Sequence, residues 1–365
     1  MKTKTKKTIL KKNHLILISM VVFISLNCLI ALAESSKSIN NNISTTKNSP
    51  VTIQSICVYE PNSTFLAQAL TPQKEYDIKV TVNDNDCIGN PDGGLDKLNI
   101  KLWYDKDGDD ILLNPPDESV FNSYNSYNPQ NSLKIKWVRG GTASLIGGGE
   151  TWNLNQKKSI LPNESNLNDT TFEFVFNIKI GKIAKEASST NRWQIAAKIT
   201  DVDGFESYKA FEKPTGFGLE MDFYGEMVMD TTTVDVNNLF TTNTNGEIVY
   251  EVKNISFISN SKFNKTVKAD NFLVDINDYK NLLFRMHNAD NKNTFALRAN
   301  KVSNFNTSKI LPLNKSNLVF DKDVSPSTSE KQKNENNFLY ILLNKNFNKD
   351  IHYKGTIIYG INNSF

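Results

Sequence analysis

Five segments between residues 65 and 211 alternate apolar with polar side chains, and this pattern limits most strongly how the chain can fold. Successive side chains of a strand point to opposite faces, so each segment has one apolar and one polar face. Such segments pair into sheets that share an apolar core, which predicts an all-β protein. The apolar positions are Tyr76, Ile78, Val80 and Val82; Leu98, Ile100, Leu102 and Tyr104; Leu133, Ile135 and Trp137; Phe172, Phe174, Phe176, Ile178 and Ile180; Trp193, Ile195, Ala197 and Ile199.

The N-terminus has the pattern of a secretory signal peptide over residues 1–33. Six lysines and no acidic residue precede Leu15, an apolar stretch runs from Leu15 to Ala33, and Ala31-Leu32-Ala33 forms a small-x-small site before Glu34. This stretch is close in length to a membrane span, so an uncleaved N-terminal anchor is the alternative. Both interpretations predict an exported protein that is secreted or held at the cell surface.

The charge balance gives no support for nucleic acid as a partner. The chain has 42 basic and 39 acidic residues, a formal charge of +3. Removal of the six leader lysines leaves 36 basic against 39 acidic residues, a balance of −3. A nucleic acid or an anionic membrane therefore lacks an electrostatic basis for binding.

Composition divides the rest of the chain into a lead-in and two domains. Residues 34–50 are mainly Ser, Thr, Asn and Lys, which predicts a flexible lead-in. A first domain spans residues 51–212, and Lys213-Pro214-Thr215-Gly216 marks its end. The second domain, residues 217–365, ends in a period-two run from Tyr353 to Ile361. We therefore predict two consecutive β-sandwich domains.

One run in the first domain combines an aromatic residue, alternating apolar residues and the turn Thr200-Asp201-Val202-Asp203-Gly204. This run, from Trp193 to Gly204, resembles the penultimate strand and following turn of PKD-type immunoglobulin-like modules of prokaryotic surface proteins. Residues Tyr76 to Asp84 resemble the second strand of these modules. The resemblance implies that the first sandwich is immunoglobulin-like. The chain departs from the pattern in having Trp193 where such modules usually carry Tyr, and in its insertion from Asp105 to Asn131.

Two cysteines, Cys57 and Cys87, follow the leader. In an exported chain, two cysteines most simply form one disulfide. Closing a loop of about 31 residues would stabilise the fold by about 3 to 4 kcal/mol in the chain-entropy model. We expect Phe65 to Thr71 to form the first strand, which places Cys57 beside Cys87 at one pole of the sandwich.

Acidic side chains follow two of the predicted strands and are candidates for a metal site. In an immunoglobulin-like sandwich the two loops lie at the same end, so their carboxylates can converge. Carboxylate oxygens in number are the ligands that calcium takes, which makes calcium the candidate cofactor. The alternative is that these residues only form solvated turns. The candidates are Asp84, Asp86 and Asp92 after the second strand, and Asp201 and Asp203 after the penultimate strand.

Trp103 is a candidate for ligand contact. It falls out of phase with Leu102 and Tyr104, which predicts a side chain that faces a ligand rather than the core. Together with Trp137 and Trp152 it could form an exposed aromatic surface for sugar, although aromatic residues in strands more often belong to the core.

Catalytic patterns are missing from the sequence, and we predict that the chain is not an enzyme. His287 and His352 stand alone, without the spacing of metal ligands. Gly147-Gly148-Gly149 precedes Glu150 and not the lysine of a phosphate-binding loop.

Export and β-patterning favour a structural or adhesive cell-surface protein that requires no cofactor. Its expected partners are components of the cell envelope or the extracellular matrix, including glycans, or a second copy of the chain. One alternative is a filament subunit that donates its lead-in, or the strand from Tyr353 to Ile361, to a neighbour. Another alternative is a carbohydrate-binding module.

Overall fold

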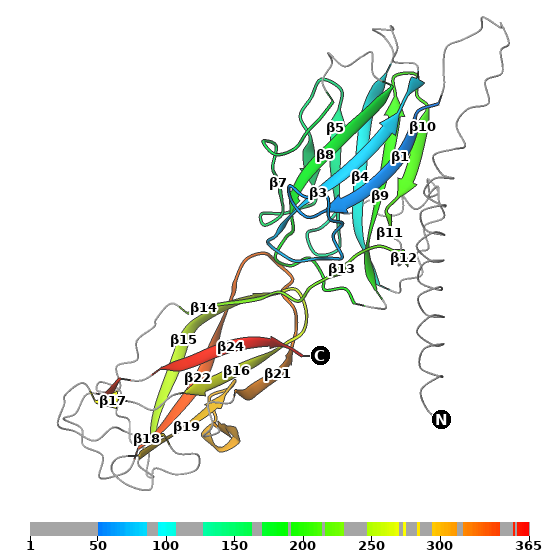
Figure 1. Cartoon of the computed structure of the whole chain (residues 1–365). Helices are drawn as coiled ribbons and strands as arrows, with labels where there is room; N and C mark the ends of the chain where they lie inside the picture. Colours follow the sequence, from blue (N-terminus) through cyan, green and yellow to red (C-terminus); the bar gives the residue numbers. More distant parts are fainter. Residues whose placement is uncertain are drawn as a thin grey trace, which may run out of the picture. The chain divides into compact units, whose positions relative to one another are not determined.

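The structure is a computed structural model, and it describes residues 50–85, 94–106, 127–162, 170–188, 191–213, 216–229, 247–269, 273–274, 283–284, 294–311, 317–343, 353–354 and 356–364. These residues form β-strands and one short 3-10 helix, η4 (Phe305–Thr307). None of the described helical segments is long and apolar enough to span a bilayer. The predicted all-β class is confirmed, and Figure 1 shows the sheets in two groups along the chain.

The first group is a sandwich of two antiparallel sheets. One sheet has the order β1 (Thr52–Tyr59), β3 (Glu75–Asn83), β8 (Thr171–Lys179) and β7 (Asn153–Leu154). The other has the order β10 (Glu206–Ala210), β9 (Arg192–Asp201), β4 (Leu95–Asp105), β5 (Ser132–Val138) and β6 (Ser144–Ile146). Read in chain order as strands A to G, these are the A-B-E-D and G-F-C-C′-C″ sheets of a variable-type immunoglobulin domain. The immunoglobulin-like prediction is therefore correct at the level of topology.

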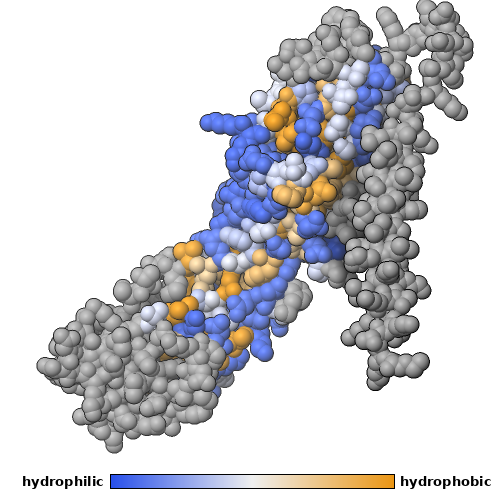
Figure 2. All heavy atoms as spheres, viewed as in Figure 1, coloured by the Kyte–Doolittle hydropathy of each residue, from blue (hydrophilic) through white to orange (hydrophobic). Residues whose placement is uncertain are grey.

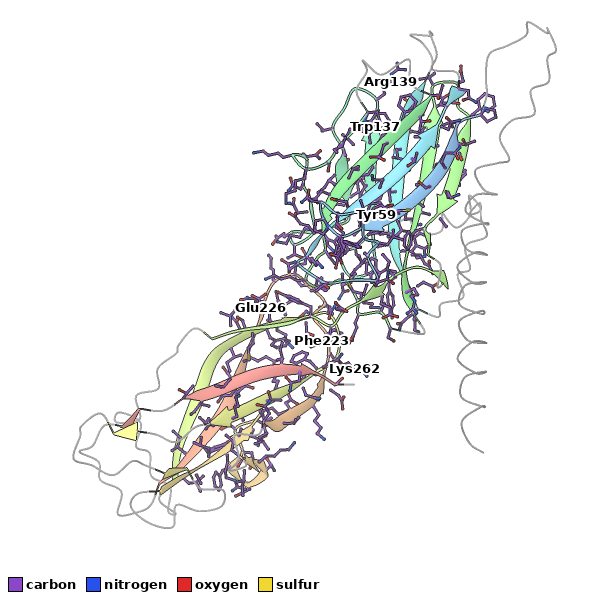
Figure 3. All side chains as sticks on the ribbon, viewed as in Figure 1. Tyr59, Trp137, Arg139, Phe223, Glu226 and Lys262 are labelled. Carbon is purple, nitrogen blue, oxygen red and sulfur yellow. The ribbon has the colours of Figure 1, made fainter. Side chains whose placement is uncertain are left out.

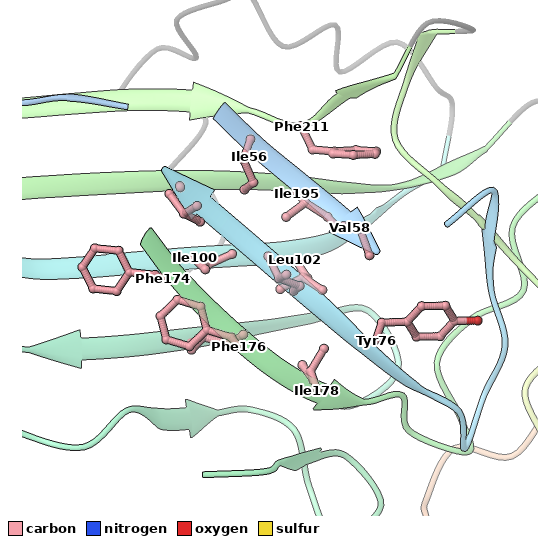
Figure 4. Packing of buried hydrophobic residues seen from close by; sticks show 14 of the residues in the cluster. Ile56, Val58, Tyr76, Ile100, Leu102, Phe174, Phe176, Ile178, Ile195 and Phe211 are labelled. Atoms are coloured by element: carbon pink, nitrogen blue, oxygen red, sulfur yellow. The ribbon is translucent and has the colours of Figure 1, made fainter. Parts of the chain in front are cut away.

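The core of this sandwich lies between the inward faces of the two sheets. Figure 4 shows Ile100 and Leu102 of β4 beside Phe174 and Phe176 of β8. The rings of Trp137 and Phe174 meet edge to face across the sheets, with centroids 5.0 Å apart. The period-two apolar positions of the sequence face the opposite sheet, and they are buried except for the half-buried Tyr104. In β4 and β9 most of the intervening side chains are buried as well.

The first strand differs from the expected one. It is β1, and the segment from Phe65 to Thr71 contributes only the short β2 (Ala69–Leu70). A bulge between Ile53 and Ser55 shifts the register of β1 against β3. The buried positions Ile53 and Ile56 are therefore three residues apart, and the sequence of this strand lacks the regular period-two alternation.

Short ribbons follow the first sandwich. β11 (Glu212–Lys213) pairs with β12 (Gly216–Phe217), and β13 (Glu220–Met221) pairs in parallel with β2. Leu219 and Met221 belong to the first core, although both follow residue 212, where the composition places the end of the domain.

The second group is also a sandwich. Its larger sheet has the order β14 (Gly225–Met229), β15 (Glu247–Ser259), β22 (Lys333–Leu343), β19 (Thr294–Asn300) and β18 (Leu283–Phe284), with β20 (Lys309–Ile310) paired to β19. The smaller sheet has the order β21 (Leu318–Val324), β16 (Phe263–Ala269) and β24 (Ile357–Asn363), and β17 (Leu273–Val274) pairs with β23 (Tyr353–Lys354). One apolar cluster joins the two sheets through residues such as Leu339 of β22 and Val267 of β16.

Polar side chains connect the segment after β8 to the start of the second sandwich. The Asn260 amide donates to the carbonyl oxygens of Ala184 and Asp222, each over 2.9 Å. Lys182 Nζ lies 2.6 Å from Glu226 Oε2 on β14, and Figure 3 labels Glu226 there. Asn260 is buried, so its amide satisfies carbonyl groups that water does not reach.

Candidate ligand-binding groove

The outer face of the four-stranded sheet carries a groove of about 570 Å³. Its floor comes from the outward positions of three strands, where Tyr59 of β1 pairs in register with Asp77 of β3, and Lys79 of β3 with Val175 of β8. Figure 3 labels Tyr59 at the end of β1. In the space-filling view, small apolar patches lie between polar residues over the first sandwich (Figure 2). A cavity of this size lies in the range of small-ligand sites.

One wall of the groove is a tightly bonded loop after β1. The backbone N–H of Glu60 donates to the Phe65 carbonyl over 2.9 Å, and the Ser63 N–H donates to the Glu60 carbonyl over 3.1 Å. The Asn62 N–H donates to Asp77 Oδ2 over 3.0 Å, which ties the loop to the floor. These bonds fix the backbone of the loop, and Phe65 is 77% exposed on it.

The opposite wall is formed by Ile160 and Lys158. The backbone of Ile160 exchanges two hydrogen bonds of 2.8 Å with Val175, and its side chain is 61% exposed. Lys158 Nζ lies 2.5 Å from Glu75 Oε2, which fixes its direction along the sheet. Two large apolar side chains are therefore presented to solvent on facing walls.

The charged groups of the groove neutralise one another. Lys79 Nζ lies 3.1 Å from Glu173 Oε1, and it lies 5.7 Å from the centroid of the Tyr59 ring. Asp77 Oδ1 accepts from the Asn177 amide over 2.7 Å. Burial raises the pKa of the Tyr59 hydroxyl, and nearby Cys57 and Glu173 add to the rise. Both lysines of the lining are thus paired, Lys79 with Glu173 and Lys158 with Glu75, so the lining favours an uncharged ligand over an acidic one.

Two of the five predicted calcium ligands converge at the pole where β3 and β9 end. Asp84 and Asp201 are both buried, at 1% and 6% exposure. Burial raises the pKa of Asp201 above its ordinary value; backbone N–H bonds from Phe205 and Asp203 oppose the rise, and the charge of Asp84 adds to it. The Asp201 carboxyl is thus within reach of the charge of Asp84.

Asp201 also organises the turn that follows it. Its Oδ1 accepts from the backbone N–H groups of Asp203 and Phe205, over 3.0 and 2.8 Å. This is the turn-forming role of the alternative hypothesis. Asp203 is exposed, and Asp86 and Asp92 lie outside the described residues. Among the residues that the structure describes, no three acidic, histidine or cysteine side chains are grouped to hold a metal ion.

The tryptophan side chains do not form an exposed surface for sugar. Trp103 points away from the main core, as its phase predicts, and packs against Ala196 and Ala210, but it is only 1% exposed. Trp137 and Trp152 belong to the main core, at 4% and 3% exposure. The exposed aromatic ring at the groove is Phe65, which sequence reasoning missed because nothing in a loop sequence marks an apolar side chain as exposed.

Cys57 is not beside the acidic pole as expected. It lies within β1, opposite Lys79 of β3, because β1 and not the segment after Phe65 is the first strand. Cys87 and the predicted signal peptide, residues 1–33, lie outside the described residues. Within the described part of the chain Cys57 has no disulfide partner, and the bond to Cys87 stays a prediction.

Comparisons with known proteins return little. No protein-family model matches the chain, and no curated protein matches it. A solved structure of the C-terminal domain of the Streptococcus agalactiae AgI/II polypeptide BspA is 10% identical, covers 86% of this chain and 96% of that chain, and has a TM-score of 0.23. A structure described as BspA_C_WT is 11% identical, covers 84% and 95%, and has a TM-score of 0.22. Similarity at these TM-scores carries no argument about function.

Proposed function

We propose that the chain is an exported cell-surface protein with an adhesive role, and that it binds through the first sandwich. The observation that carries this proposal is the groove, in which a bonded loop presents Phe65 to solvent. Aromatic side chains are common anchors of binding surfaces, and a bonded loop backbone reduces the conformational entropy that is lost on binding. The leader pattern ending at Ala33 supports export.

The proposal includes the finer assignment of the first sandwich to the PKD type and the lack of enzymatic activity. The PKD assignment is supported by the turn after β9, where Asp201 binds the backbone of Asp203 and Phe205. A binding role is supported by the pairing of the charged groups in the groove. Lys79 contacts Glu173, and Asp77 accepts hydrogen bonds from the Asn177 amide and the Asn62 N–H, so these side chains are held as contacts for a ligand.

The test is attachment of beads coated with residues 34–365 to immobilised matrix components and to cells that produce the protein. The expected result is attachment above that of uncoated beads, together with labelling of the native protein on intact cells by an impermeant biotin reagent. Labelling only after lysis, or attachment no better than that of uncoated beads, would refute the proposal.

Electron microscopy distinguishes a filament subunit from the proposed adhesive protein. In the structure β24 pairs with β16 of its own chain at all seven positions from Ile357 to Asn363, so donating this strand would break an existing sheet. Filaments from residues 34–365 that disappear when the chain starts at residue 51 would favour lead-in exchange. Single particles from both chains would exclude it.

Calcium binding is tested by melting temperature in calcium and in chelator. If Asp84 and Asp201 share a calcium ion, Asp84→Ala and Asp201→Ala lower the melting temperature more in calcium than in chelator, where Asp201→Ala loses only its turn hydrogen bonds. An equal change in chelator would reject a shared site and leave the turn-forming role.

A further inference from the structure

We propose that the groove between the loop after β1 and Ile160 binds a neutral oligosaccharide. This inference rests on the proposed adhesive function and names the chemical class of its partner. It uses groups that no tryptophan-based prediction included, namely Phe65 and Ile160 on the walls and the polar residues of the floor.

The groove combines apolar and polar surfaces. The two walls present Phe65 and Ile160, at 77% and 61% exposure, and the floor presents the Lys79–Glu173 pair and Asp77. A sugar ring has an apolar C–H surface and a rim of hydroxyl groups, so it can cover the apolar side chains while its hydroxyls bind the fixed polar groups. Hydrogen bonds to ionised carboxylate and ammonium groups are stronger than those between neutral groups.

The charged side chains that line the groove affect which ligands it can bind. Both lysines of the lining already have a carboxylate partner, Lys79 with Glu173 and Lys158 with Glu75, and Asp77 accepts hydrogen bonds from Asn62 and Asn177. An acidic ligand would therefore have to displace an existing ion pair. Hydroxyl groups both donate and accept, and they can therefore bind both members of an ion pair without displacing either. The balance favours a neutral glycan over an acidic polymer.

A peptide that binds by adding a strand to the sheet does not fit the groove. Such a peptide needs the free backbone groups of a sheet edge. At the groove this edge is closed, because Ala67 N–H donates to the Val58 carbonyl over 2.9 Å and Tyr59 forms a bridge with Leu66. A ligand of the groove therefore binds to side chains on the face of the sheet.

The experiment is an array of neutral oligosaccharides built from glucose, galactose, mannose and N-acetylhexosamines, with acidic glycans on the same array, probed with residues 34–365. The best neutral binder is then titrated by calorimetry against wild type, Phe65→Ala and Phe205→Ala. Phe205 is a matched control, because it is 41% exposed on the same sandwich but does not line the groove.

The expected result is binding of at least one neutral glycan, with an affinity that falls roughly tenfold or more in Phe65→Ala and stays unchanged in Phe205→Ala. Phe65→Ala removes an exposed side chain, so its melting temperature should match that of wild type. No neutral binder, binding of acidic glycans alone, or equal affinity in all three chains would overturn the inference. If coated beads attach while no neutral glycan binds, the glycan class fails and the adhesive function stands; if the beads do not attach, the adhesive function itself fails.

Discussion

The two sandwiches differ in how their interiors are stabilised. The first core is apolar and rich in aromatic rings, with Trp137, Trp152 and Trp193 between the sheets. In the described part of the second sandwich the apolar cluster is smaller, and the buried Lys265 lies against the carboxylates of Asp321 and Glu335.

This difference separates two sources of stability. Burial of apolar surface depends little on pH, whereas an ionic cluster depends on the protonation of its carboxylates. The second sandwich should therefore respond to acid and to loss of one charge, and the apolar core of the first sandwich to loss of packing. The buried charged residues of the first sandwich, such as Lys101 and Asp201, lie outside that apolar cluster. Hydrogen exchange measured segment by segment can follow each sandwich in the intact chain.

The largest effect is expected from Trp193→Ala in the first sandwich. Trp193 is fully buried, its Nε1 donates to the Lys185 carbonyl over 2.7 Å, and its ring centroid lies 5.8 Å from that of Trp152. Removing it leaves a cavity and should cost about 3 to 5 kcal/mol of unfolding free energy. Faster exchange should appear in β3, β4, β8 and β9. Phe205→Ala is the control, and a cost equal to that of the control would contradict the description of the core.

Lys265→Ala should destabilise the second sandwich by about 3 kcal/mol, because it leaves the buried carboxylate of Asp321 and the half-buried carboxylate of Glu335 without their central cation. The Lys265 ammonium contacts Glu335 and lies 3.6 Å from Asp321 Oδ2. Lys301 and Lys333 still pair with these acids, which keeps the loss at the lower end of the usual range.

Lys301→Ala is the matched control for this network. Its ammonium lies 3.0 Å from Asp321 Oδ1, but its side chain is 58% exposed. Solvent screens such a pair, so the change should cost less than about 1 kcal/mol in chemical denaturation. Equal losses in Lys265→Ala and Lys301→Ala would show that burial does not distinguish the two lysines.

Asn260→Ala should cost about 2 kcal/mol, because it leaves backbone groups at the connection between the sandwiches without partners. The Asn260 side chain donates to Ala184 and Asp222 and accepts from the Tyr224 N–H over 2.7 Å. Exchange should rise at residues 182–187 and 222–226 before it rises in either core. Unchanged exchange at both segments would contradict a bonded connection.

The smallest expected effect is on the pH dependence of stability, to which Asp201 and Glu335 contribute in opposite directions in the acid range. The pKa of Asp201 is raised, so its contribution to stability is complete below its unfolded value of about 3.9 and is lost as pH rises through the folded pKa. Burial would raise the pKa of Glu335, but hydrogen bonds from Lys265 and Lys333 outweigh it, and the folded pKa lies below the ordinary value. Its contribution is present above about 4.3 and is lost as pH falls through the folded pKa.

Asp201→Asn and Glu335→Gln isolate these two responses in melting curves recorded across the acid range. Asp201→Asn keeps an oxygen for the Asp203 and Phe205 N–H groups and should remove a loss of stability on raising the pH. Glu335→Gln should remove a loss of stability that wild type shows when the pH is lowered. Wild-type-minus-variant differences in stability that change with pH in the same direction for both substitutions would contradict the stated shifts.

The fold was largely predictable from the sequence, because a half-buried strand displays its alternation directly. β1 could not be recognised from the sequence, because the extra residue of the bulge between Ile53 and Ser55 breaks the period-two alternation. The convergence of Asp84 with Asp201 was predictable, because both follow strands that end at one pole of an immunoglobulin-like sandwich.

The groove and the Lys265 cluster could not be predicted in this way. Phe65 and Ile160 lie in separate loops, and only the backbone bonds of these loops determine that both face solvent over one sheet. Lys265 meets Glu335 from another sheet, a pairing that depends on how the sheets stack.

Bead attachment with three chains tests the central claim most directly: wild type, Phe65→Ala and Phe205→Ala, each spanning residues 34–365. The account predicts that wild type and Phe205→Ala attach equally well and that Phe65→Ala loses most of its attachment, because Phe65 lines the groove and Phe205 does not. Equal attachment of all three chains, or none by wild type, would contradict adhesion through the first sandwich.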